Sequence, residues 1–249
     1  MATFVLIHGA YQGGWIWKPV AARLRAAGHT VYTPTLDGCG ERHHQVRPGI
    51  TVATQAREVA QFLFFEDLEP VVLVGTSSGG MVICRTAEQA RDRIARLVFI
   101  DALALLPGEE VSKIVNRRAG SYETTDVTIG PSRTDAEQRL FADLDPATRA
   151  WALARYTLNP VAALEAPMDL GSFWTQSWRA TVIRCRRSLN PPETHQRRTA
   201  ELLKATWHEM DAGHYPMLSH PEELTRLLLP DSARPAPRGQ NPRGGNPLA

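Results

Sequence analysis

Short, continuous apolar runs alternate with amphipathic stretches through the first part of the chain. The runs are rich in Val, Ile, Leu and Phe and too short for buried helices, so they predict strands covered on both faces. The stretches between them repeat apolar residues at helical spacing. This alternation favours a doubly wound α/β fold with a mainly parallel sheet. The predicted strands are 4–8, 30–33, 71–74 and 96–100, and the predicted helices are 19–27, 51–65 and 81–90.

The regular alternation stops near residue 104 and returns near residue 179. In between, charged and aromatic residues are mixed without a strand pattern, and we expect a helical cap inserted over a site. Strands at 181–185 and 206–210, with helices at 193–205 and 221–229, then complete a sheet of about six strands. The expected divisions are a core of residues 1–103 and 179–229, a cap of 104–178 and a flexible tail of 230–249.

Composition narrows the classes of function that fit this chain. Its formal net charge of +2 over 249 residues is too small to indicate a nucleic acid or a membrane surface as partner. The start of the chain lacks the pattern of a signal peptide, and no apolar run is long enough to cross a bilayer. Its three cysteines are scattered without metal-binding spacing, so we expect no disulfide, no bound metal and a cytoplasmic location.

The stretch VLVGTSSGG, residues 72–80, contains the candidate nucleophile. Residues 75–79 fit the pattern G-x-S-x-G with Ser77 at its centre, whereas Ser78 does not fit because Thr76 is not glycine. A predicted strand precedes the motif and a predicted helix follows it. In this context the serine lies on a sharp turn, with its hydroxyl exposed above the sheet. The alternative is a turn rich in Gly and Ser without a chemical role.

A second glycine-containing stretch, His8-Gly9-Ala10, follows the first predicted strand. A loop of this kind can direct a backbone N–H toward an oxyanion, and the residue after the nucleophile supplies the usual second N–H. We therefore expect the N–H groups of Ala10 and Ser78 to form an oxyanion hole. Taken alone, a His-Gly pair is equally typical of an ordinary turn.

The base for Ser77 is expected to be a histidine that follows the last predicted strand. His214 lies there, in the stretch DAGH, and the order of serine before histidine matches hydrolases with this nucleophile motif. Structural roles are expected for the histidines in turns, in a polar loop and in other elements, namely His8, His29, His43, His44, His195, His208 and His220.

Together these motifs resemble the α/β-hydrolase superfamily, in particular bacterial members of the branch that contains plant salicylate-type esterases and hydroxynitrile lyases. The resemblance extends to Leu229 and is weakest in the predicted cap. It implies the α/β-hydrolase fold and a serine–histidine–acid triad that needs no cofactor, but it does not specify a substrate. The stretches that carry it are FVLIHGAYQGGWIW, GHTVYTPTLDGCGER, VVLVGTSSGG, ARLVFIDALALLPGE and MDAGHYPMLSHPEEL.

The sequence departs from this branch at the acid. Plant members carry an aspartate after the second-to-last predicted strand, and the matching position here holds Ser188. A neutral hydroxyl cannot stabilise an imidazolium as a carboxylate does. Related hydrolases place the acid at the end of the strand after the nucleophile helix, where this chain has Asp101. Because the ends of parallel strands face one crevice, Asp101 is the expected partner of His214, with Asp211 and Glu193 as alternatives.

Two further positions bear on the type of reaction. Hydroxynitrile lyases of this branch carry threonine after the first-strand histidine and lysine after the catalytic histidine, where this chain resembles the esterases with Gly9 and Tyr215. Aromatic residues of the cap predict either an apolar pocket wall or ordinary packing within the cap. They are Phe141, Trp151, Tyr156, Phe173 and Trp174, and the expected substrate-binding residues are Tyr11, Trp151, Tyr156 and Tyr215.

The sequence thus predicts a serine hydrolase that cleaves a carboxylic ester, thioester or lactone of a small to medium hydrophobic substrate. An acyl-enzyme would form on Ser77. One alternative is a non-hydrolytic enzyme on the same frame, such as a lyase, an eliminating enzyme or an acyl-transferring cyclase of natural-product biosynthesis. Another is a ligand-binding protein derived from a weakened hydrolase, favoured only by the serine at position 188. The expected partner is a small-molecule ester or acyl compound, and the sequence leaves a homodimer open.

Overall fold

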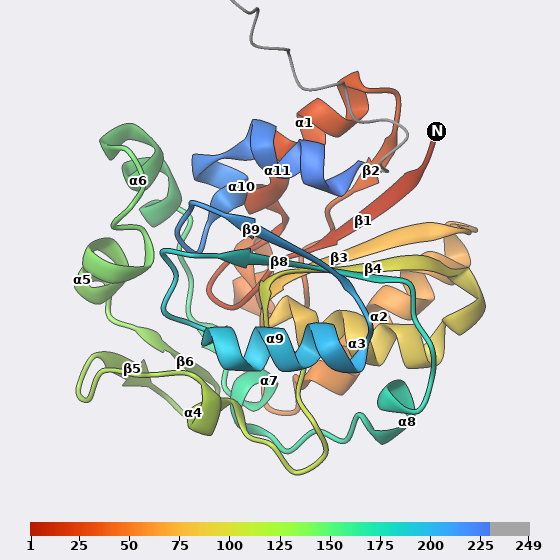
Figure 1. The fold of residues 1–249 in the computed structure, drawn as a ribbon. Helices are drawn as coiled ribbons and strands as arrows, with labels where there is room; N and C mark the ends of the chain where they lie inside the picture. The colour runs from red at the N-terminus through yellow and green to blue at the C-terminus, as the bar shows by residue number, and fades with distance from the viewer. Residues whose placement is uncertain (230–249) are drawn as a thin grey trace, which may run out of the picture.

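Six parallel strands form the centre of the molecule in the computed structural model, which describes residues 1–229. Their order across the sheet is β2-β1-β3-β4-β8-β9, so the chain builds outward from β1 in both directions (Figure 1). The predicted doubly wound sheet is therefore confirmed. The strands are β1 (Thr3–Ile7), β2 (Thr30–Tyr32), β3 (Val71–Ser77), β4 (Ile94–Ala102), β8 (Ala180–Cys185) and β9 (Thr206–Met210).

Helices cover both faces of this sheet, and a separate core of buried apolar side chains fills the space on each face (Figure 1). α1, α10 and α11 pack on one face, whereas α2, α3 and α9 pack on the other. Their bounds are α1 (Lys18–Ala26), α2 (Val52–Phe65), α3 (Gly79–Gln89), α9 (Glu193–Leu202), α10 (Pro216–Ser219) and α11 (Pro221–Leu228).

Every strand and helix predicted for the core is present, although some ends differ from the prediction. β3 and β4 are longer than predicted because their pairing continues to Ser77 and Ala102, beyond the apolar run. The pattern of apolar residues marks only the apolar part of a strand, whereas the hydrogen-bonded ladder extends into buried polar residues at the sheet edge. The residues at these two strand ends lay outside the strands predicted from sequence. The sheet holds them in place nonetheless.

Most of the segment between β4 and β8 lies across the carboxyl ends of the strands (Figure 1). Besides short helices it contains a three-stranded antiparallel sheet, in the order β5-β6-β7, which the sequence did not predict. Such short strands leave no alternating pattern in a sequence. The elements are α4 (Val111–Ile114), β5 (Tyr122–Thr124), β6 (Thr128–Pro131), α5 (Arg133–Asp135), α6 (Pro146–Leu153), β7 (Asn159–Pro160), α7 (Ala162–Glu165) and α8 (Gly171–Trp174).

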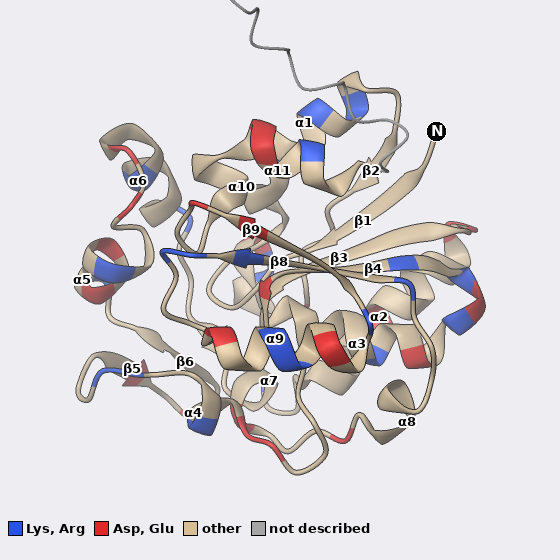
Figure 2. Cartoon of the chain, in the orientation of Figure 1, with Lys and Arg blue, Asp and Glu red and all other residues tan. Residues whose placement is uncertain are grey.

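Charged residues lie mainly on outward-facing helices and in loops, and β1 and β3 carry none (Figure 2). Basic and acidic residues are mixed along α9 and α5. Within the described part of the chain, no helix is both long and apolar enough to span a membrane. The predicted tail, 230–249, lies outside the described residues.

His8 links the end of β1 to the loop after β2 and is completely buried. Its Nε2 accepts a hydrogen bond from the backbone N–H of Leu36 at 3.0 Å, and its Nδ1 lies 2.7 Å from the carbonyl oxygen of Gly9. A neutral ring with its proton on Nδ1 satisfies both contacts. Burial lowers the pKa of His8 to about 4, and burial likewise lowers the pKa of His195 to about 4.

We expect the free energy of unfolding to fall as the pH drops from about 6.5 to about 4. Over this range the unfolded chain binds protons on His8 and His195, whereas the folded chain keeps both rings neutral. Each histidine accounts for a loss of up to about 3 kcal/mol, which is complete below the folded pKa. Urea denaturation at a series of pH values measures the slope.

The variants His8→Gln and His195→Gln cannot take up this proton and should each flatten the slope between pH 6.5 and pH 5. Most carboxylates remain ionised in that window, so their titration does not mask the effect. An unchanged slope in both variants would contradict the assignment of buried neutral rings.

Candidate active site

Three polar residues meet at the carboxyl edge of the central sheet. Ser77 is the last residue of β3, Asp101 lies at the end of β4, and His214 lies in the loop between β9 and α10. Because the six strands are parallel, their carboxyl ends open on the same side of the sheet. The sheet thus brings together residues that are far apart in the sequence.

An irregularity in the sheet aims the side chain of Asp101. Thr76 of β3 pairs with Ile100 of β4, but the next residue, Ser77, pairs with Ala102. Asp101 is therefore the extra residue of a β-bulge. Bulges bend a strand locally and redirect a side chain, and they are common beside active sites.

Backbone strain is concentrated at this sheet edge. Ser77 has a φ of 53° and Asp101 a φ of 44°, both in the left-handed region that residues other than glycine rarely occupy. Tyr11, in the loop after β1, has a φ of 69°. In residues 1–229 the two other such residues, Asp67 and Lys204, lie in turns that follow α2 and α9. Strain costs about 1–3 kcal/mol per residue and persists where the surroundings enforce it, as they do at functional sites.

Glycines leave the room that the turn at Ser77 needs. A Cβ atom on Gly9 would lie 2.5 Å from the Cβ of Ser77, and one on Gly79 would lie 2.5 Å from the carbonyl oxygen of His8. A Cβ atom on Gly75 would lie 2.7 Å from the carbonyl oxygen of Gly79. Since real Cβ atoms do not approach other atoms this closely, β1, β3 and the start of α3 pack this tightly only with glycine at all three positions.

The central contact of the site joins Asp101 to His214. Asp101 is completely buried, and its Oδ2 lies 2.5 Å from His214 Nδ1. Its other oxygen, Oδ1, accepts hydrogen bonds from Gln196 Nε2 at 2.7 Å and from the backbone N–H of Cys185 at 3.4 Å. The proton on the histidine therefore lies on Nδ1, facing the carboxylate, and Nε2 is left to accept a proton.

Ser188 lies beside the same histidine nitrogen. Its Oγ is 3.4 Å from His214 Nδ1 and donates a hydrogen bond to the carbonyl oxygen of Asn190 at 2.9 Å. The carboxylate that faces the imidazole thus comes from β4, and the serine lies next to it. The two alternative carboxylates, Asp211 and Glu193, instead form ion pairs with arginines at the surface.

Gln196 is a buried residue of the site that sequence reasoning missed. It lies on α9 and is 2% exposed. Besides its bond to Asp101, its Nε2 donates to the carbonyl oxygen of Pro191 at 2.9 Å. One amide group thereby connects the Asp101 carboxylate to the loop that contains Ser188. The only sequence signal for this role was the presence of a polar residue on the buried face of a predicted helix.

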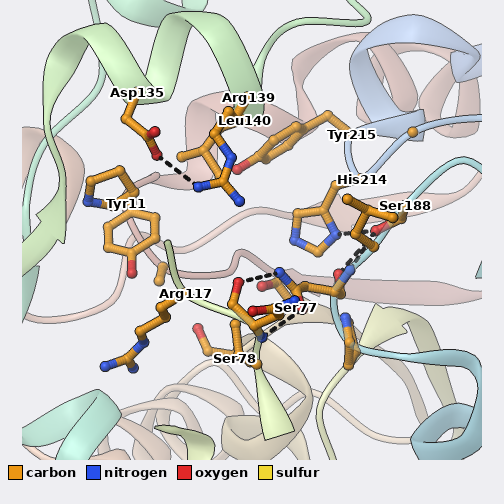
Figure 3. Close-up of a pocket in the computed structure, with 18 of the residues that line it drawn as sticks. Tyr11, Ser77, Ser78, Arg117, Asp135, Arg139, Leu140, Ser188, His214 and Tyr215 are labelled. Carbon is orange, nitrogen blue, oxygen red and sulfur yellow. Dashed lines mark hydrogen bonds and ion pairs between the residues drawn. The ribbon is translucent and has the colours of Figure 1, made fainter. Parts of the chain in front are cut away.

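A cavity of about 280 Å³ opens between the sheet edge and the cap, and both Ser77 and His214 line it (Figure 3). Its size suits a small organic molecule. Asp101 contacts His214 through Nδ1, so the other ring nitrogen, Nε2, faces away from this carboxylate. Four further residues expected at the site line the same cavity, namely Ala10, Tyr11, Ser78 and Tyr215.

Trp151 and Tyr156, which were expected to bind substrate, are not among the described residues that line this cavity. The ring of Trp151 packs edge-on against Trp15, with 5.2 Å between centroids. Tyr156 donates a hydrogen bond to the carbonyl oxygen of Pro131 at 2.5 Å, and its ring lies 5.9 Å from that of Tyr11. Neither residue is placed on the cavity wall, and their role in substrate binding stays a prediction. Three other cap aromatics pack against the two cores instead, namely Phe141, Phe173 and Trp174.

Charged side chains form part of the cavity wall, which the sequence did not predict. Most of them come from the cap. Its sequence is irregular, and no periodic spacing of these residues predicts that they line one cavity. The cavity therefore combines an apolar and tyrosine-lined part with a charged part. The three arginines and two aspartates are Arg117, Arg139, Arg187, Asp135 and Asp143. In the part of the chain that the structure describes, no group of three or more His, Cys, Asp or Glu side chains could hold a metal ion.

Known proteins share both the sequence pattern and the fold of this chain. The profile of the alpha/beta hydrolase family matches residues 4–227. A carbendazim hydrolyzing esterase from Nocardioides sp. (strain SG-4G) is 43% identical over 115 residues, which cover 46% of this chain and 48% of that esterase. Methylesterase 7 of Arabidopsis thaliana is 28% identical over 251 residues, with 91% of this chain and 94% of the relative covered.

Among solved structures, an extracellular alpha/beta-hydrolase from a Paenibacillus species is similar, with a TM-score of 0.79 and 24% identity. The superposition covers 92% of this chain and 98% of that protein. A methylesterase from Arabidopsis, MES16, has a TM-score of 0.74 at 20% identity and covers 92% of this chain and 97% of its own. At these identities the two structures support the fold.

Replacing Gln196 with leucine should lower the free energy of unfolding by about 1.5–3 kcal/mol, because the buried Asp101 carboxylate loses a donor. Gln55→Leu is a matched control. Gln55 is also buried on a helix, but its Nε2 donates to the neutral carbonyl oxygen of Asp37 at 3.0 Å. Its loss should cost only about 0.5–1.5 kcal/mol. Chemical denaturation measures both, and equal losses would show that Asp101 does not depend on Gln196.

Proposed function

Because the chain belongs to the alpha/beta hydrolase family, we propose that it is a serine esterase that cleaves a small carboxylic ester. One observation carries the proposal. The buried Asp101 contacts His214 Nδ1 at 2.5 Å in a site whose cavity also contains Ser77. Relatives named as an esterase and as methylesterases support ester cleavage and make methyl esters the first substrates to test.

In the proposed mechanism, Ser77 Oγ attacks the ester carbonyl carbon while His214 Nε2 takes its proton. The C–O bond to the alcohol then breaks, and His214 returns the proton to the departing alcohol. The acyl group remains on Ser77 until a water, deprotonated by the same nitrogen, attacks it and releases the acid. Asp101 orients the imidazole and stabilises its charged form without taking its proton.

The backbone N–H groups of Ala10 and Ser78 are proposed to bind the oxyanion that forms during each attack. Both residues line the cavity that contains Ser77. Ser78 directly precedes α3, and the N-terminal end of a helix favours negative charge. Loss of one such donor usually lowers the rate by about 10²–10³-fold, so this contribution rivals that of a side chain.

Two residues favour hydrolysis over the elimination carried out by hydroxynitrile lyases. A side chain on residue 9 does not fit, because a Cβ atom on Gly9 would lie 2.5 Å from the Cβ of Ser77. Tyr215 follows His214 and is 2% exposed, and burial raises the pKa of its phenol. The phenol therefore stays neutral, and this position offers no cation to hold a leaving cyanide.

Ser77→Ala should lower kcat for p-nitrophenyl butyrate by about 10⁶-fold, because the variant has no nucleophile. Ser78→Ala is the matched control, since it removes the neighbouring hydroxyl but keeps the backbone N–H. Its kcat should stay within about tenfold of the wild type. Labelling by a fluorophosphonate should be lost in Ser77→Ala and kept in Ser78→Ala. Turnover that survives in Ser77→Ala would exclude this mechanism.

A second pair of variants compares Asp101 with Ser188, which occupies the position where plant members of the branch carry the acid. Asp101→Asn keeps the shape of the side chain but no longer fixes the histidine tautomer, so kcat should fall by about 10⁴-fold. Ser188→Ala should lower kcat by less than about tenfold, because its Oγ lies 3.4 Å from His214 Nδ1 and carries no charge. The reverse order of effects in steady-state assays would assign the supporting role to Ser188 instead.

A further inference from the structure

Arg139 extends from the cap into the cavity. It lies in the helical turn Ala136–Leu140, and Figure 3 shows its guanidinium in the space between Tyr11 and His214. A substrate whose ester group reaches Ser77 occupies the same cavity. The charge of Arg139 therefore bears directly on which substrates fit.

The protein satisfies the donors of Arg139 only in part. A guanidinium has five N–H donors, and a close pair with a carboxylate uses two of them at about 2.7–2.9 Å. Arg139 Nη1 lies 3.5 Å from Asp135 Oδ2, which is the only partner found for it among the described residues. The Arg139 side chain is 37% exposed, so its remaining N–H groups are open to a ligand.

The carboxylate beside Arg139 is shared with an arginine outside the cavity. The guanidinium of Arg118 lies 4.0 Å from Asp135 Oδ1, so the buried Asp135 does not serve Arg139 alone. An anion within the cavity would complete the pairing of Arg139. The other charged groups of the cavity have partners of their own: Arg117 pairs with Glu165 at 2.6 Å, Arg187 contacts Asp211, and Asp143 accepts a hydrogen bond from the N–H of Gly213.

We propose that Arg139 binds a second carboxylate of the substrate, so that the preferred substrate is a monoester of a small dicarboxylic acid. This inference rests on the proposed ester hydrolysis at Ser77 and names its substrate class. The ester carbonyl faces Ser77, while the free carboxylate at the other end of the acyl chain accepts hydrogen bonds from Arg139. One water is consumed, the acyl C–O bond breaks, and the products are the dicarboxylic acid and the alcohol.

The remainder of the cavity suits the chain that joins two such groups. Methylene groups need apolar contacts, and several aliphatic side chains supply them along the wall. They are Leu103, Val111, Val115, Leu140 and Leu164. A neutral ester of the same length would keep these contacts but leave the Arg139 guanidinium without an anion.

Two esters of equal acyl length test the assignment, p-nitrophenyl hydrogen glutarate and p-nitrophenyl pentanoate. The wild type should show the higher kcat/KM for the glutarate ester. Arg139→Gln should lower that value by about 10- to 100-fold, the usual contribution of a hydrogen bond to a charged group. The value for the pentanoate ester should stay within about twofold, since no charge is involved.

Arg118→Gln is the matched control. It removes the same charge beside Asp135, but Arg118 is 69% exposed and does not line the cavity. Its ratio of kcat/KM values for the two esters should equal that of the wild type within about twofold. If Arg118→Gln changed this ratio as much as Arg139→Gln does, the lower kcat/KM for the glutarate ester would reflect a general loss of positive charge. That result would overturn the assignment of the carboxylate site to Arg139.

Two further results separate this inference from the proposed esterase activity. If both esters are hydrolysed and Arg139→Gln affects them equally, the carboxylate site is wrong and the esterase stands. If neither ester is hydrolysed, the proposed activity on them fails, and calorimetric titration with glutarate decides the carboxylate site separately. Binding to the wild type but not to Arg139→Gln supports the site, whereas equal binding or none overturns it.

Discussion

A single buried carboxylate organises the site. Burying an ionised group costs several kcal/mol unless hydrogen bonds surround it, and Asp101 meets that condition on both oxygens. Gln196 and the backbone of Cys185 donate to Oδ1, and His214 Nδ1 faces Oδ2. These donors come from β8, α9 and the loop after β9, so the orientation of the imidazole depends on the correct packing of three later segments against β4.

The sheet edge holds its reactive geometry through strain that its neighbours enforce. Ser77 and Asp101 both have positive φ, and they lie side by side where the pairing of β3 with β4 shifts by one residue. Such conformations are unfavourable by themselves and persist because the surrounding core over-determines them. Glycines at positions 9, 75 and 79 let the adjacent backbones close around the turn. The packing of the rigid central strands thus offsets the free-energy cost of the strained turn.

The cavity joins this rigid edge to a cap of different character. The core is built from a six-stranded parallel sheet and amphipathic helices, whereas the cap consists of short helices and strands of few residues. Trp151 packs against Trp15 outside the cavity lining, whereas Tyr122 and two arginines of the cap, Arg117 and Arg139, line the cavity. In many enzymes a rigid scaffold holds the catalytic groups, and a more variable segment contacts the substrate. Changes in such a segment can alter substrate preference because they leave the core intact.

Sequence alone determined the layers of the fold and two of the residues at the sheet edge. Strands buried on both faces leave continuous apolar runs, and the turn that carries Ser77 requires glycines at fixed spacing, so both features are local. The position of His214 followed from chain order. Tertiary structure alone decided which carboxylate reaches that histidine, because a one-residue bulge turns Asp101 toward it. It also decided which cap side chains face the cavity, among them Tyr122 and Arg139, since the inner and outer sides of a thin, irregular segment leave no periodic trace in its sequence.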